Sequence, residues 1–213
     1  MFTGIIQGLA KVVSVHDKPN FRTHVVELPE YMLNGIETGA SVAHNGCCLT
    51  VTEIDGCRIH FDVMKETLRI TNLSELVEGD DLNVERAARF TNEIGGHLMS
   101  GHIMTTGKIL KIFNFENHRQ IWFRIVDSTL MKYIFYKGFI GVDGVSLTVG
   151  EIMPACFCVY LIPETLKRTV LGKKKLGEKV NIEIDSQTQA VVDTVERVMA
   201  TKETTLPQYN KLQ

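Results

Sequence analysis

NGCCLTVTEI, residues 45–54, returns later in the chain as DGVSLTVGEI, residues 143–152. The turn pair Asn45-Gly46 becomes Asp143-Gly144, and the Leu-Thr-Val that follows is unchanged. Asn-Gly and Asp-Gly pairs ahead of alternating apolar residues are strong signals of a tight β-turn. One hairpin therefore occurs twice, and Cys48 in the first copy becomes Ser146 in the second.

The repeat extends well beyond the hairpin. Glu-Thr-Leu occurs at 66–68 and 164–166, and Asn-Val-Glu at 83–85 is answered by Asn-Ile-Glu at 181–183, again 98 residues on. Residues 3–12 match residues 100–109 at a separation of 97, which one single-residue indel explains. A fixed period over most of 213 residues indicates a duplication. It predicts two related domains, 1–96 and 97–187, joined near Gly95-Gly96.

Each copy has the pattern of short β-strands. Runs such as RIHFDVM at 58–64 and QIWFRIV at 120–126 are rich in β-branched and aromatic residues and are separated by glycine-containing turns. This pattern predicts an all-β barrel or sandwich. The residues after Glu66 and Glu164 predict one or two helical turns, the second ended by Gly172.

A helix is predicted over residues 188–202. Val191, Val192, Val195, Val198 and Met199 form an apolar stripe at helical spacing. The stripe either packs on its own barrel or contacts the same helix in other subunits, and we favour the second because closed barrels leave little open core. Residues 203–213 show no periodicity, and we expect a flexible tail.

Composition excludes some functions. The formal net charge of −2 gives no field that attracts nucleic acid, and the basic run Lys173-Lys174-Lys175 has no aromatic neighbours, which disfavours a nucleic-acid-binding small barrel. No stretch is long and apolar enough to span a membrane, and the amino-terminal sequence favours a cytoplasmic protein. The five cysteines suggest no pairing and no metal-ligand spacing, so we expect free thiols, with Cys47, Cys57, Cys156 and Cys158 used in packing.

Six motifs in order resemble the riboflavin synthase family: MFTGIIQG, NGCCLTV, MKETLRITNL, GGHLMSGHI, YKGFIGVDGVSLTV and LIPETL. The resemblance covers the chain from Met1 to about Arg197. It implies two six-stranded antiparallel barrels and a C-terminal helix that joins three subunits. It also implies a reaction without a cofactor, in which one 6,7-dimethyl-8-ribityllumazine transfers a four-carbon unit to a second one. The products are riboflavin and 5-amino-6-ribitylamino-2,4(1H,3H)-pyrimidinedione.

The resemblance implies one ligand pocket on each barrel. The residues implied for the first are Cys48, Leu49, Thr50, Asp62, Val63, Met64, Lys65, Glu66 and Thr67. Those implied for the second are Ser146, Leu147, Thr148, Ile162, Pro163, Glu164, Thr165, Leu166 and Lys167. Further implied contacts are Gly4, Ile5, Ile6, Gly101, His102, Ile103 and Lys137. The pocket is expected between the first barrel of one subunit and the second barrel of its neighbour, with Cys48 and Thr50 facing His102, Ser146 and Thr148.

Positions implied in catalysis are Phe2, Ser41, Cys48, His102, Ser146 and Thr148. His102 is the natural candidate to move a lumazine methyl proton, because histidine titrates near neutral pH. The Cys48 thiolate is a possible nucleophile at C7 of the lumazine, but no cationic residue follows or precedes it, and we favour a positioning role. Phe2 is expected to cover the ligand, and Ser41 to donate a hydrogen bond or to serve the strand.

Some of these residues have simpler explanations. Thr50 and Thr148 are also ordinary strand residues, and Glu66 and Glu164 suit the start of a helix. The main alternative function is a lumazine-binding chromoprotein without the reaction. Such relatives lose polar residues in one pocket, whereas this chain keeps them in both, which favours the enzyme.

Overall fold

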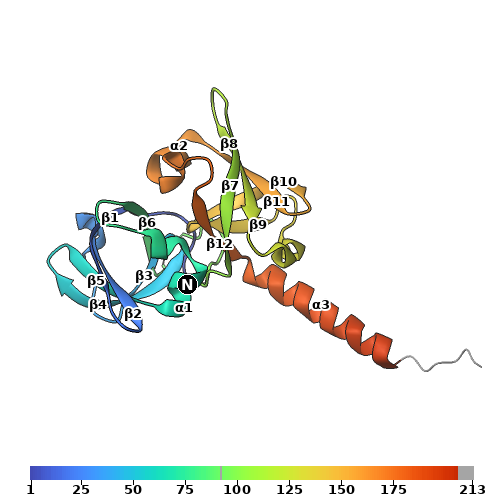
Figure 1. Cartoon of the computed structure of the whole chain (residues 1–213), viewed down its shortest axis with the longest axis horizontal. Coiled ribbons are helices and arrows are strands. Elements are labelled where there is room, and N and C mark those ends of the chain that lie inside the picture. The colour runs from blue at the N-terminus through green and yellow to red at the C-terminus, as the bar shows by residue number, and fades with distance from the viewer. Residues whose placement is uncertain (92, 206–213) are drawn as a thin grey trace, which may run out of the picture.

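The structure, a computed structural model, describes residues 1–91 and 93–205 and consists of two closed barrels and one long helix (Figure 1). The first barrel contains β1 (Gly8–Asp17), β2 (Phe21–Glu27), β3 (Ser41–His44), β4 (Cys47–Asp55), β5 (Arg58–Met64) and β6 (Asp81–Arg86). The second contains β7 (Thr105–Asn114), β8 (Arg119–Ile125), β9 (Phe139–Val142), β10 (Val145–Met153), β11 (Cys156–Leu161) and β12 (Lys179–Ile184).

Both barrels have the same topology. The strand order is β1-β2-β5-β4-β3-β6 in the first and β7-β8-β11-β10-β9-β12 in the second, and every pairing is antiparallel. The predicted six-stranded barrels are therefore confirmed, and the sandwich is excluded. Closure leaves no unpaired edge strand in either sheet.

Short helices follow equivalent strands. The first barrel has η1 (Glu30–Met32), α1 (Lys65–Ile70) and η2 (Asn72–Glu75), and the second has η3 (Ser128–Tyr133), α2 (Pro163–Arg168) and η4 (Val170–Gly172). The predicted turns after Glu66 and Glu164 are present. However, α2 ends at Arg168 and not at Gly172, because Thr169 adopts an extended conformation and a separate 3-10 turn follows it.

The two copies exchange their leading segments. Ile6, which precedes the first barrel, packs in the core of the second, and Ile103, which precedes the second, packs in the core of the first. Between them, the backbones of Phe2 and Met99 donate to each other's carbonyl oxygens at 2.8 and 3.0 Å. Each barrel therefore needs a segment of the other copy to complete its core.

The repeated turns meet back to back at the centre of the molecule. Gly46 and Gly144 have φ of +82° and +80°, and a Cβ on either would lie 2.7 Å from the backbone nitrogen of the other. Asn83 donates its side-chain amide to the Asp143 carbonyl at 2.8 Å, and Asn181 donates to the Asn45 carbonyl at 2.9 Å. These paired bonds make the barrel contact close to twofold symmetric.

The C-terminal helix α3 (Ser186–Thr205) projects from the second barrel (Figure 1). It is tied to η3 by a hydrogen bond from Tyr133 to Asp193 and an ion pair between Lys132 and Glu196, and only Val192 packs against the barrel core. The rest of its predicted stripe, Val191, Val195, Val198 and Met199, is 48–64% exposed. The C-terminal helix is thus confirmed. Of the tail predicted at 203–213, residues 203–205 belong to α3, which corrects that part of the prediction, and residues 206–213 lie outside the described residues.

Candidate functional site

Many of the residues implied as ligand contacts lie on the outer surfaces of the barrels. Side chains alternate along a strand, so on β4 Leu49 points into the core while Cys48 and Thr50 point outward. On β10 Leu147 points inward while Ser146 and Thr148 point outward. We name the outer side of β4 and β5 the first face, and the outer side of β10 and β11 the second face.

The implied residues differ in exposure. The exposed ones are Ile5, Thr50, Met64, Lys65, Glu66, His102, Lys137, Thr148, Ile162, Pro163, Glu164 and Lys167. The half-buried ones are Ser41, Cys48, Asp62, Thr67, Ser146, Thr165 and Leu166, and the buried ones are Phe2, Gly4, Ile6, Leu49, Val63, Gly101, Ile103 and Leu147. Side chains such as Val63 and Leu147 belong to the barrel cores, so only their backbones are available to a ligand.

The first face brings Cys48 and Gly101 together. The Cys48 amide donates to the Gly101 carbonyl at 2.9 Å, and Gly101 has φ of +82° with space so tight that a Cβ would lie 2.6 Å from Cys48 Cβ. His102 follows directly and is exposed. The expectation that His102 faces Cys48 across a subunit boundary is therefore wrong, because Gly101 already adjoins Cys48 in the same chain.

Other residues of the first face also have local partners. Ser41 pairs with Thr50 across β3 and β4, and Asp62 accepts a hydrogen bond from the Thr23 hydroxyl at 2.6 Å. Glu66 forms an ion pair with Arg69 at 2.6 Å, and that hydrogen bond is the main cause that lowers the pKa of this exposed carboxyl. The face therefore presents a thiol, a hydroxyl and carboxylates side by side.

Phe2 does not cover a ligand. Its ring is 1% exposed and packs against Ala43, Met99 and Cys48 beneath the first face. The expected lid role is corrected, because the exchanged amino-terminal segment carries this ring between the two barrels. Phe2 supports Cys48 from behind.

The second face repeats the arrangement with different residues. The Ser146 amide donates to the Gly4 carbonyl at 2.8 Å, as the Cys48 amide does to Gly101. Gly4 has φ of +73°, and a Cβ there would lie 2.5 Å from Ser146 Cβ. Ile5 and Ile6 therefore belong beside Ser146, and His102 and Ile103 belong beside Cys48.

Only the second face has a histidine bonded to its hydroxyl. Nδ1 of His97 lies 2.6 Å from Ser146 Oγ, and the imidazole stacks on Phe139 with ring centroids 5.0 Å apart. Burial is the main cause that lowers the pKa of His97, and Asp185 opposes that shift, so the environment favours the neutral ring. Nε2 is buried and has no hydrogen-bond partner among the described residues.

Sequence reasoning missed His97. The residue lies within the motif GGHLMSGHI, but it precedes the repeated segment and has no counterpart in the first copy. Its partner Ser146 is 49 residues away and reaches it only in the folded chain.

Lys137 also distinguishes the second face. Its φ is +65°, a left-handed conformation unusual for a residue with a Cβ, and its amide donates to the Val149 carbonyl at 2.9 Å. The equivalent residue of the first copy is Gly39, with φ of +90° and the same bond to Val51. A lysine at a position suited to glycine indicates that the side chain is needed there.

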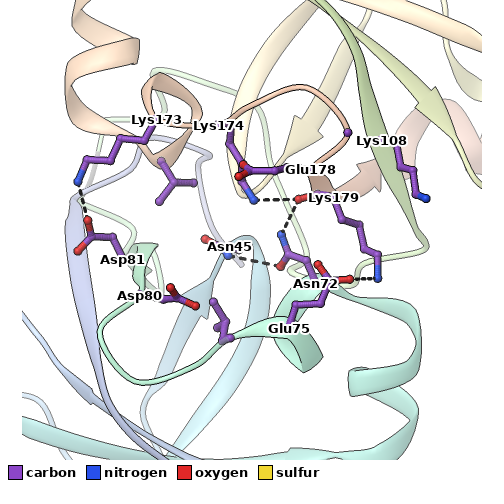
Figure 2. A pocket seen from close by; sticks show the side chains of 13 residues that line it. Asn45, Asn72, Glu75, Asp80, Asp81, Lys108, Lys173, Lys174, Glu178 and Lys179 are labelled. Atoms are coloured by element: carbon purple, nitrogen blue, oxygen red, sulfur yellow. Dashed lines mark hydrogen bonds and ion pairs between the residues drawn. The ribbon is translucent and has the colours of Figure 1, made fainter.

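A cavity of about 560 Å³ lies elsewhere, in the cleft between the barrels. Its lining is rich in charged residues and includes none of the implied ligand contacts (Figure 2). A smaller cavity of about 220 Å³ reaches Ile6 and Lys167 beside the second face.

All five cysteines are free thiols, as expected. Cys57 is exposed in the turn between β4 and β5, so its assignment to packing is wrong. Within residues 1–91 and 93–205, no helix has the length and hydropathy needed to cross a membrane.

Comparisons with known proteins agree with the duplication. A family model described as the lumazine binding domain matches residues 3–87 and again residues 100–185. The riboflavin synthase of Escherichia coli (strain K12) is 73% identical over 208 residues, covering 98% of both chains. That of Chlamydia pneumoniae is 44% identical over 200 residues, covering 94% of this chain and 98% of the relative.

Solved structures show the same architecture with ligands. LumP complexed with 6,7-dimethyl-8-(1'-D-ribityl) lumazine is similar with a TM-score of 0.79 and 26% identity, over 87% of this chain and 100% of LumP. LumP complexed with riboflavin gives a TM-score of 0.81 and 27% identity, over the same shares. The double barrel is thus an arrangement that holds lumazine and flavin in another protein.

Proposed function

The chain belongs to the riboflavin synthase family, and we propose that it converts two molecules of 6,7-dimethyl-8-ribityllumazine into riboflavin and 5-amino-6-ribitylamino-2,4(1H,3H)-pyrimidinedione. The reaction transfers a four-carbon unit between two copies of one compound, so the enzyme is a transferase of riboflavin biosynthesis. The observation that carries this proposal is the repetition of a polar face at equivalent strands of both barrels. Two related faces suit a donor and an acceptor that are the same molecule.

We propose that a complete site combines the first face of one chain with the second face of another. Thr50, Met64, Thr148 and Ile162 are exposed in the single chain, which leaves both faces open to a partner. The exposed stripe of α3 supports assembly of three chains through their C-terminal helices. Free thiols at all five cysteines support a reducing, cytoplasmic location.

The two faces supply different proton chemistry. On the second face, a neutral His97 imidazole accepts a hydrogen bond from the Ser146 hydroxyl, so Ser146 can pass its proton to His97 as its oxygen takes a proton from a bound lumazine methyl group. On the first face, exposed His102 and the Cys48 thiol stand beside the acceptor. A well-placed acid or base contributes roughly 10²–10⁴ in rate, and orientation of two reactants about 7–11 kcal/mol. Positioning of the two lumazine rings is therefore expected to contribute more to the rate than acid–base catalysis does.

The activity test uses the lumazine alone. The purified protein should form riboflavin, seen by its absorbance, with one riboflavin for every two lumazines consumed. Tight lumazine binding without riboflavin would instead make the protein a chromoprotein and overturn the proposal.

The shared site is tested by mixing inactive variants. A Cys48→Ala variant and a Thr148→Ala variant carry defects on different faces, so mixed assemblies should regain activity. The matched control mixes Cys48→Ala with His102→Ala, which both damage the first face and should regain none. Absence of recovery in both mixtures would place the whole site within one chain.

A further inference from the structure

The cleft between the barrels has walls of opposite charge. Glu75 and Asp81, from the first barrel, stand on one side, and Lys173 and Lys179, from the second, stand on the other (Figure 2). Lys173 forms an ion pair with Asp81 at 2.5 Å, and Lys179 forms one with Glu75. In both pairs the acid belongs to the first barrel and the base to the second.

The repeat relates these two ion pairs to each other. At the separation of 98 residues, Glu75 corresponds to Lys173 and Asp81 to Lys179. The pair Glu75–Lys179 is therefore the symmetry image of the pair Lys173–Asp81. The two copies have opposite charges at the same two positions of one shared interface.

A neighbouring pair of positions has kept its charge. Asp80 and Glu178 are also equivalent, and each accepts a backbone hydrogen bond within its own turn, from Val77 at 2.9 Å and from Lys175 at 3.0 Å. Acids are thus retained where they cap a turn. At positions 75/173 and 81/179, where the side chains meet the other barrel, the charges are opposite.

We infer that these opposite walls select the pairing of a first barrel with a second barrel and oppose the pairing of either barrel with its own kind. Two first barrels joined in this geometry would place Glu75 against Asp81 twice. Two second barrels would place Lys173 against Lys179 twice. Like charges at these distances repel and exclude wrong partners.

The contacts at the centre of the interface only partly determine which barrels can pair. The turn glycines and the amide bonds from Asn83 and Asn181 occur in both copies and suit any pairing. Two second barrels are further opposed by Asp143, which is fully buried and needs the Asn72 amide at 2.8 Å, since the residue equivalent to Asn72 is Val170. For two first barrels, Asn45 and Asn72 offer compatible amides, so the acidic wall is the main barrier, although Lys11 of the same barrel pairs with Asp81 at 2.5 Å and offsets part of its charge.

The first test is a mutant cycle in the full-length protein. Glu75→Lys places a cation against Lys179, and Lys179→Glu places a carboxylate against Glu75, so each should lower the folding equilibrium constant about tenfold. The double variant restores an opposite pair and should return to within about threefold of the parent. Losses that simply add in the double variant would overturn the inference.

The second test concerns partner choice. A positive-wall variant carries Glu75→Lys and Asp81→Lys, so both walls of its cleft are positive, and a negative-wall variant carries Lys173→Glu and Lys179→Glu, so both are negative. Each alone should unfold at lower denaturant than the parent, whereas the two refolded together should recover the parent midpoint and lose this recovery in about 1 M salt. The variant with all four changes should be more stable alone than either two-change variant, but less stable than the parent, because Asp81→Lys also removes the ion pair with Lys11 of the same barrel. Failure of the mixture to recover would overturn the selection of partners.

A control pair checks that recovery depends on the cleft. Asp17 and Arg22 form an ion pair at 2.7 Å within the first barrel, and neither residue lines the cleft. Variants with Asp17→Arg and Arg22→Asp should show no recovery when mixed.

Discussion

The first barrel encloses two histidines at positions where the second encloses Ile121 and Val142. His24 and His44 are fully buried, and none of their four ring nitrogens has a hydrogen-bond partner among the described residues. Burial lowers the pKa of His24 to about 4, with Arg22 adding to the effect, and burial lowers the pKa of His44 to about 3, with His24 adding to it. His44 packs against the edge of Phe61, with ring centroids 4.2 Å apart.

The turns at the barrel contact have changed far less. Asn45-Gly46 and Asp143-Gly144 touch each other, so a change in one must suit the other. A side chain inside a closed barrel meets only its own copy. The contrast teaches that close backbone contact at the turns preserves their likeness, whereas the barrel interiors, the ligand faces and the charged walls of the cleft are free to diverge.

The largest expected effect on stability comes from the two turns at the barrel contact. Gly46→Ala and Gly144→Ala each place a Cβ 2.7 Å from the opposite backbone and also require a residue with positive φ. We expect each to lower the free energy of unfolding by about 3–4 kcal/mol, as measured by chemical denaturation. Gly79→Ala is the control, since its φ is +91° but no atom lies within 4 Å, and it should cost only about 1 kcal/mol. Equal losses of unfolding free energy for Gly46→Ala and Gly79→Ala would show that contact between the two turns does not contribute to stability.

The buried histidines should make the first barrel sensitive to acid. In the unfolded chain they titrate near pH 6.5, but in the folded chain they stay neutral to about pH 4 and below. Between these values the unfolded chain binds more protons, so stability is complete above pH 6.5 and falls as the pH decreases. The loss at pH 4 from His24 is on the order of 3 kcal/mol.

The second barrel supplies the matched replacement. His24→Ile with His44→Val should remove most of the pH dependence between 6.5 and 4, measured by denaturation at each pH, whereas exposed His16→Gln should not. At pH 5, the backbone amides of β2 and β3 should exchange their hydrogens faster than those of β8 and β9. Equal opening of both barrels would contradict the comparison.

Much of the fold was predictable from local signals. The fixed separation, the Asn-Gly and Asp-Gly turns and the alternating strands predicted two all-β domains, because these patterns depend on neighbours in sequence. The family resemblance, and not the pattern, selected six-stranded barrels over a sandwich. The exchange of Ile6 and Ile103 was not predictable, since each looks like the start of its own copy. The burial of Phe2 follows from the same exchange.

The site was predicted in part for the same reason. Strand alternation places Cys48, Thr50, Ser146 and Thr148 on outer faces, which the sequence indicates. The bond between His97 and Ser146 and the approach of Gly101 to Cys48 join distant segments, and no period marks them. The charged walls of the cleft become meaningful only when the repeat is combined with the contact geometry.

Asp143 gives a pH dependence of opposite sign at the barrel contact. Its pKa is raised to about 6, mainly by burial, with Lys174 and the bonds from Asn181 and Asn72 opposing that shift. Between pH 3.8 and 6 the folded chain binds more protons, so its contribution to stability falls as the pH rises. Asp143→Asn copies Asn45 and removes this carboxyl. The free energy of unfolding of the variant minus that of the parent should be about 1–2 kcal/mol larger at pH 8 than at pH 4. A difference that does not change with pH would show that the carboxyl is not strained by its burial.

Cys48→Ser makes the first face like the second. If the thiol only positions the lumazine, the hydroxyl should retain most of that function, and kcat should fall by no more than about tenfold, or about 1.4 kcal/mol. A fall of about a thousandfold or more, with binding unchanged, would indicate that Cys48 attacks the substrate. Cys47→Ser is the control, because Cys47 lies in the barrel core and should affect stability more than turnover.

Lys137→Gly makes the second copy like the first at the smallest expected cost. Glycine removes the strain of φ +65°, worth about 1 kcal/mol, but gains freedom in the unfolded chain, so net stability should stay within about 1 kcal/mol. The cation beside the second face is lost, and lumazine affinity should fall about fivefold, measured by titration in a Cys48→Ala background to avoid turnover. Lys137→Asn also tolerates positive φ and should lose the same affinity, whereas Lys137→Arg should retain most of it. If glycine and asparagine bind lumazine as well as lysine does, the left-handed lysine serves only the turn, and the second face differs from the first chiefly through His97 and Ser146.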